Sequence, residues 1–123
     1  MIEKRSHTRT QRLFVGRNRY SGAGRQDASF EVQEGGRARV IGSLHYSTVS
    51  ALLIAGVDAI DGGQATVIDL AGVTASDSSG LALLIEWLSV AKDDAKVLRY
   101  ENIPTQLHQL ARLSEVEELL VPG

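Results

Sequence analysis

Residues 67–84 read VIDLAGVTASDSSGLALL, and this stretch decides the fold. Residues 66–73 are nearly all apolar, which predicts a central strand covered on both faces of a sheet. A polar turn follows, and an apolar helix is expected from about Ser79 to Ala91. Ser78 or Ser79 would then stand at a helix N-terminus, where free backbone N–H groups and the positive end of the helix dipole favour added negative charge. The turn therefore fits a phosphate switch or a docking surface.

The remaining pattern predicts a small α/β domain. Residues 29–34 and 37–42 alternate apolar and polar side chains around Gly35 and Gly36, as in a hairpin of two half-buried strands. A helix should follow Ser47 or Thr48, and it should end near residues 61–63. A further strand over residues 96–100, a helix from Pro104 to Ser114 and a short closing element complete the chain. The order β-β-α-β-α-β-α predicts an α/β fold, with helices packed on a small mixed sheet.

Composition excludes several classes of protein. At 123 residues with 43% hydrophobic residues, the chain has the length of one domain with a true core. It has no Cys and no paired His spacing, so we expect no disulfide and no metal site. It has no apolar run of about 18 residues and no apolar signal core after Met1, so we expect a cytoplasmic protein.

An enzymatic role is not expected. Gly72 and Gly80 are not spaced around Ser76 as a nucleophile elbow requires. The chain has no G-x-x-x-x-G-K-[ST] loop either, so no nucleotide should bind by that route. We therefore expect no catalytic residue and no cofactor.

Charge divides the chain into two parts. Residues 1–27 hold seven Lys and Arg against two Asp and Glu, a net charge of +5, whereas residues 28–123 hold six against 13, a net charge of −7. The first part also has little apolar periodicity, so we expect a basic, mostly disordered tail over residues 1–27 and one domain over residues 28–123. The tail fits an arm for nucleic acid, anionic lipid or the acidic domain itself, or a solvated extension, which we favour. Residues 13–15 are its only local apolar cluster.

Residues 29–121 resemble the STAS family, the sulfate transporter and anti-sigma-factor antagonist domains. The resemblance rests on the buried strand VIDL, the turn Asp77-Ser78-Ser79-Gly80 and the apolar helix that follows. It implies a STAS-like fold. In the anti-sigma antagonists a partner kinase phosphorylates the Ser of this turn, and Ser78 is the matching position. An anti-sigma antagonist switched by phosphorylation of Ser78 is thus one reading, with the anti-sigma kinase as partner.

A finer resemblance favours another reading. Residues 80–88 (GLALLIEWL) and 101–107 (ENIPTQL), with Ala111-Arg112-Leu113, look like MlaB-type proteins. Those are cytoplasmic STAS subunits that bind and support the ATPase of a bacterial phospholipid ABC transporter, in a system that maintains lipid asymmetry. The resemblance implies an accessory subunit held at the inner membrane through the transporter, with the ATPase as favoured partner and no nucleic acid. The basic tail departs from the family, because such subunits usually begin close to the first strand.

The helix after the turn supports a binding role from its own pattern. Leu81, Leu84, Ile85 and Leu88 form one apolar stripe that should face the sheet, and a second stripe holds Leu83, Trp87 and Val90. A second stripe on a surface helix suggests a partner, and Trp is enriched at interface hot spots. The alternative is that the tail or the last helix covers Trp87. Our expected partner-binding residues are Asp77, Ser78, Ser79, Gly80, Leu83 and Trp87.

Two of these residues have additional local roles. Asp77 can cap the helix by accepting backbone N–H bonds, and this role is compatible with partner contact. Gly80 should permit close approach at the helix start because it lacks a Cβ, although a merely flexible turn is the alternative.

Overall fold

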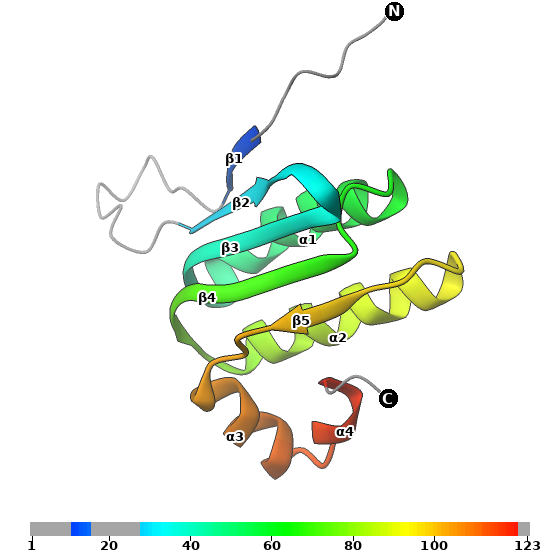
Figure 1. Ribbon diagram of the computed structural model, residues 1–123. Coiled ribbons are helices and arrows are strands. Elements are labelled where there is room, and N and C mark those ends of the chain that lie inside the picture. The colour runs from blue at the N-terminus through cyan, green and yellow to red at the C-terminus, as the bar shows by residue number, and fades with distance from the viewer. Residues whose placement is uncertain (1–10, 16–27, 121–123) are drawn as a thin grey trace, which may run out of the picture.

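The computed structural model describes residues 28–120 in full and the backbone of residues 11–15 (Figure 1). Along residues 28–120 the strands and helices follow one another in the order that the sequence predicts. The elements are β1 (Gln11–Val15), β2 (Ala28–Val32), the short 3-10 helix η1 (Glu34–Gly36), β3 (Arg37–Leu44), α1 (Tyr46–Asp61), β4 (Val67–Ser76), α2 (Ser78–Asp93), β5 (Arg99–Glu101), α3 (Thr105–Leu113) and α4 (Glu117–Leu120).

The five strands form one mixed sheet in the order β1-β2-β3-β4-β5. The pairs β1/β2 and β2/β3 are antiparallel, whereas β3/β4 and β4/β5 are parallel. The α/β class and the order of elements from β2 onward are confirmed. Among the described helices, none is both long and apolar enough to cross a bilayer.

Strand β1 lies inside the segment for which the sequence predicts mostly disorder. Its backbone pairs with β2 in register from Gln11 with Val32 to Val15 with Ala28, around the cluster at residues 13–15. A strand of five residues gives too little periodic signal to stand out in a basic, polar segment. The prediction of a disordered tail otherwise concerns residues 1–10 and 16–27, which lie outside the described residues.

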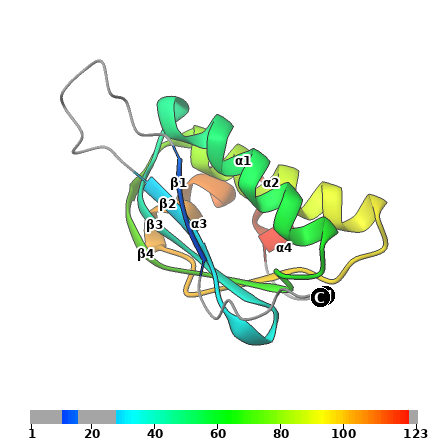
Figure 2. The ribbon, with the colours of Figure 1, turned by 90° about the horizontal axis from the view of Figure 1, so that it is seen from above.

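The prediction that the central strand is covered on both faces is wrong. Helices α1 and α2 lie on one face of the sheet (Figure 2). Burial alternates at the start of β4, where Ile68 and Leu70 are fully buried but Asp69 between them is not. The run looked continuous because small residues such as Ala71 and Gly72 occupy outward positions without adding polarity.

A charged network covers the start of the second face. Arg39 donates to Glu31 of the neighbouring strand at 2.8 Å, and Arg37 pairs with Glu101 of β5. Asn102 donates from Nδ2 to Oδ1 of Asp69 at 2.9 Å, which fastens the end of β5 to β4. This hydrogen bond, more than any other contact, lowers the pKa of Asp69, and Arg37 and Arg39 act in the same direction.

The core between the helices is built around Trp87, the one Trp in the chain. Its indole Nε1 donates to the carbonyl oxygen of Leu53 in α1 at 3.2 Å. Its ring meets Phe30 of β2 edge to face, with 5.6 Å between centroids. A Cβ at Gly56 of α1 would overlap the indole, so the glycine permits the two helices to approach.

This packing overturns the expectation of a second, exposed stripe on α2. Trp87 has no exposed surface, and Leu83 is only 4% exposed. Helix α2 has the sheet beneath it, α1 on one side and α3 and α4 on the other, so both apolar stripes are used inside the domain. Helix α1 covers Trp87 through Leu53 and Gly56. Most of the tail, which the sequence analysis names as another possible cover, lies outside the described residues.

We expect Trp87→Ala to lower the free energy of unfolding by about 3–5 kcal/mol, because it empties a buried aromatic site and removes the hydrogen bond to the Leu53 carbonyl. Gly56→Ala should also destabilise, because its methyl group would overlap the indole. Urea denaturation followed by circular dichroism measures both. Val97→Ala, at a side chain that is 72% exposed, is the control and should change stability by less than about 0.5 kcal/mol. A Trp87→Ala loss as small as the control's would contradict this packing.

The Asn102–Asp69 bond predicts a pH effect. Because the pKa of Asp69 is lowered by folding, its contribution to stability is present above its unfolded pKa and is lost as pH falls through the folded value, in acid below about pH 4. Asn102 has a positive φ of 57°, which glycine also adopts without strain. The substitution Asn102→Gly therefore removes the Nδ2 donor without straining the backbone. The Asp69 pKa, measured by NMR titration, should rise, and the acid loss of stability should shrink. An unchanged pKa would show that the bond does not form.

Candidate functional site

The candidate site lies where two helices begin side by side. Strands β3 and β4 are parallel, so the chain leaves both at the same edge of the sheet and enters α1 and α2 there (Figure 1). Leu44 and Ser76, the last residues of these strands, are register partners. The N–H of Asp77 donates to the carbonyl oxygen of Leu44 at 3.1 Å, which joins the second turn to the first strand.

Asp77 is the N-cap of α2, as the sequence predicts. Its Oδ1 accepts a hydrogen bond from the N–H of Ser79 at 2.7 Å, and its carbonyl oxygen accepts one from Gly80 at 3.0 Å. The side chain is exposed and carries the only charge in the turn. The cap satisfies one of the free N–H groups of the helix start and leaves a carboxylate at the surface.

The three hydroxyls of the turn have different places. Ser76 is buried; its Oγ donates to the Asp77 carbonyl at 3.0 Å, and its N–H donates to Oε1 of Gln106 in α3 at 3.0 Å. Ser78, the first residue of α2, is exposed, and Ser79 is half-buried at the edge of a groove. Ser78 is therefore the hydroxyl that an outside protein reaches most freely.

Gly80 permits a close approach, which supports the prediction made for it. It is buried, and a Cβ there would overlap Oγ of Ser76 and lie 2.9 Å from Cβ of Leu44. A real Cβ essentially never lies closer than 3.0 Å to such a non-bonded heavy atom. The first turn of α2 can therefore sit against the end of β3 only with glycine at this position.

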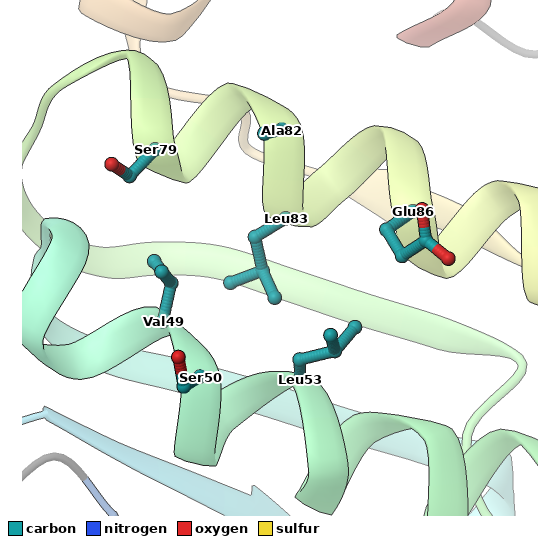
Figure 3. Close-up of a pocket in the computed structure, with 7 residues that line it drawn as sticks. All are labelled: Val49, Ser50, Leu53, Ser79, Ala82, Leu83 and Glu86. Carbon is teal, nitrogen blue, oxygen red and sulfur yellow. The ribbon is translucent and has the colours of Figure 1, made fainter.

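A groove of about 350 Å³ runs between α1 and α2 beside the turn (Figure 3). Leu83 of α2 points toward Val49 and Leu53 of α1, and Glu86 stands at the far end. Aliphatic side chains form most of the surface, with a few polar groups along it. The lining residues are Val49, Ser50, Leu53, Ser79, Ala82, Leu83 and Glu86.

The structure thus brings together five of the six residues expected to bind a partner. Asp77, Ser78, Ser79 and Gly80 form the turn, and Leu83 lines the groove that continues from it. The sixth, Trp87, lies beneath the surface, so the direct contact expected of it is wrong for the folded domain. A side chain with no exposed surface acts only through the packing of α1 on α2.

The sequence analysis identifies no partner-binding residue in α1. In the structure Val49 and Leu53 of that helix are only half-buried and line the groove. One signal was available, because residues 46–57 contain no charged side chain. A surface helix of an ordinary domain shows charged or polar residues on its outer face.

The described residues show no cluster of three or more His, Asp or Glu that could hold a metal ion. The turn offers hydroxyls, one carboxylate and helix N–H groups, and the carboxylate of Asp77 is engaged by the N–H of Ser79. Its chemistry suits recognition, or acceptance of a phosphoryl group from another enzyme.

Comparison with known proteins points to one fold. A family model described as "Mlab, STAS domain" matches residues 31–122. The phosphorylated form of SpoIIAA, a Bacillus cell fate determinant, is 17% identical over 76% of this chain and 90% of that one, with a TM-score of 0.55. The unphosphorylated form of SpoIIAA, described as an anti-sigma factor antagonist, is 17% identical over 76% and 87%, with a TM-score of 0.58. At this identity the likeness shows the fold alone. No curated protein matches the chain.

We expect Gly80→Ala to lower the free energy of unfolding by about 1–3 kcal/mol, because its methyl group has no space between Ser76 and Leu44. Ser76→Gly should recover part of this loss in the double variant, because it removes the Oγ that the methyl group overlaps. Thermal and urea denaturation measure the change. Ser78→Ala, at an exposed neighbour, is the control and should stay within about 0.5 kcal/mol. A Gly80→Ala variant as stable as the control would refute the close approach.

Proposed function

This chain belongs to the STAS domain family, and on that premise we propose that it is a non-catalytic accessory subunit of a phospholipid-transporting ABC complex. In this role it binds the ATPase subunit and supports its activity, and the complex maintains lipid asymmetry. The matching family model carries the Mlab description. The ENIPTQL segment that resembles MlaB-type proteins folds into the end of β5 and the start of α3, and Gln106 within it accepts from Ser76 below the turn.

The observation that carries the proposal is the exposed turn at the start of α2, continuous with an apolar groove. Asp77 and Ser78 are exposed, whereas Gly80 and Ser76 beneath them hold the turn rigidly against β3. A rigid, exposed turn beside aliphatic surface has the character of a protein interface, because little order must be gained on binding. The turn and Leu83 are the proposed contact residues for the ATPase.

The proposed setting is the cytoplasmic side of the inner membrane, reached through the transporter rather than by insertion. The domain spans residues 28–123 in this proposal, and strand β1 of the basic segment before it adds to the edge of its sheet. Binding of that segment to lipid or nucleic acid would appear as salt-sensitive affinity that is lost when residues 1–27 are deleted.

The second candidate is an anti-sigma-factor antagonist switched by phosphorylation of Ser78. Two observations favour it: Ser78 is the exposed first residue of α2, and the similar structures include SpoIIAA in both phosphorylation states. A phosphate at this position would add about −1.5 to −2 charges, stabilised by the helix dipole. The same charge on the contact surface would disturb a partner that binds the unmodified turn.

We predict that Ser78→Asp weakens binding to the ABC ATPase of the same organism at least tenfold, because it places a second carboxylate beside Asp77 in the contact. Calorimetry or co-purification with the tagged ATPase measures the affinity. Ser89→Asp adds the same charge to an exposed position three turns further along α2 and should bind as the unmodified chain does. If the unmodified chain, Ser78→Asp and Ser89→Asp all bind with equal affinity, the turn is not part of the interface. If the unmodified chain forms no complex with the ATPase, the transporter role is rejected.

The alternative has its own test. An anti-sigma kinase of the same organism, incubated with ATP and this chain, should transfer one phosphoryl group, and Ser78→Ala should abolish the transfer. Mass spectrometry of the intact protein measures it. Transfer to Ser78 together with failure to bind the ATPase would favour the antagonist.

A further inference from the structure

Resting on the proposed role as a protein-binding subunit, we propose that the outer face of α1 and the groove beside it receive an amphipathic segment of the partner. That segment carries apolar side chains flanked by Lys or Arg. The surface is called the α1 face below, and it consists of Tyr46, Val49, Ser50, Leu53 and Ile54 of α1 together with the groove residues of α2.

The α1 face is unusually apolar for a surface helix. Tyr46 is 80% exposed and Ile54 is 64% exposed, with Ser50 between them at steps of four residues along the helix. Val49 and Leu53 lie half-buried beside this line and descend into the groove. Large exposed apolar side chains in one continuous surface, rather than scattered singly, mark an interaction site.

Charge on the α1 face and in the groove has one sign. No Lys or Arg occurs anywhere in residues 40–91, which include all of α1 and most of α2. Within residues 40–91 the acidic groups of the two helices and their caps are Asp77 in the turn beside the groove, Glu86 at the far end of the groove, and Asp58 and Asp61 in the last turns of α1. The basic residues Lys92 and Lys96 come only at and beyond the last turn of α2. An apolar strip flanked mainly by carboxylates is complementary to an apolar strip flanked by cations.

The size of the face suits a helix. Helix α1 has 16 residues and is therefore about 24 Å long, enough to lie along a partner helix of several turns. The groove of about 350 Å³ has room for a few aliphatic side chains. An amphipathic helix laid in such a groove places anchors at i, i+3 or i+4, and i+7.

Other occupants fit less well. A second copy would bring the same carboxylates against each other, and an anionic lipid surface would be repelled by them. Residues 1–10 of this chain carry three Lys and Arg against one Glu, but their only apolar residues are Met1 and Ile2, too few to fill the strip. The partner segment remains the occupant with matching chemistry.

The test measures binding of the ABC ATPase to three variants by calorimetry at low and high salt. Ile54→Asp should weaken binding at least tenfold, because it puts a charge into the apolar strip. Glu86→Lys should weaken it at least threefold and reduce its salt dependence. Leu113→Asp is the matched control, because this side chain is 82% exposed on α3, and it should bind normally. All three substituted side chains are exposed, and unchanged melting curves verify that the variants fold.

The outcomes separate this inference from the proposed function. If the ATPase binds the unmodified chain and both α1-face variants alike, the α1 face is not the contact and the inference fails, while the transporter role stands. If the ATPase binds none of them, a synthetic amphipathic helix of Leu and Lys replaces it as the probe. NMR shifts confined to the α1 face and lost in Ile54→Asp would then support the inference, and shifts elsewhere or none would overturn it.

Two further results would also overturn it. Deleting residues 1–10 would shift the signals of Leu53 and Ile54 in the free protein if this chain's own segment occupied the face. A dimer that dissociates on Ile54→Asp, seen by analytical ultracentrifugation, would identify a second copy as the occupant.

Discussion

The contact between Trp87 and Gly56 sets the geometry on which the rest of the structure depends. The indole occupies the place of the missing Cβ, donates to the Leu53 carbonyl and stacks edge to face on Phe30 of the sheet. One side chain thereby joins α2, α1 and β2. Because α1 and α2 are held in contact, their N-terminal ends stay side by side at one edge of the sheet, and the surface between them keeps its shape.

The proposed interface lies on the surface that this helix packing creates. The turn at Asp77 rests on β3 through Gly80, and the groove that continues from it takes Leu53 from α1 and Leu83 from α2. Neither helix alone would form this groove. The opposite face of the sheet has a different character, because ion pairs such as Arg39–Glu31 join its strands and neutralise its charges. The proposed recognition surface therefore lies on the helical side, where apolar surface and acidic charge occur together.

Membership in the STAS family accounts for the fold and is compatible with two kinds of partner. Both proposals use Ser78, once as part of a contact and once as an acceptor of phosphate. They share one physical basis, since charge added at a helix N-terminus is tolerated by the helix while it changes what a partner meets. The acidic and apolar character of the α1 face adds a second criterion for the partner, independent of the turn.

The sequence by itself determined the local structure: the strand, turn and helix of residues 67–84, and the cap at Asp77. Each follows from periodicity or capping chemistry within a few residues. Only the tertiary structure decided which apolar stripes are buried. Trp87 is apolar on any helical wheel, and its burial depends on Gly56, a residue 31 positions earlier in another helix. The one-sided covering of β4 and the pairing of β1 likewise depend on distant neighbours, because burial is a property of what packs against a residue.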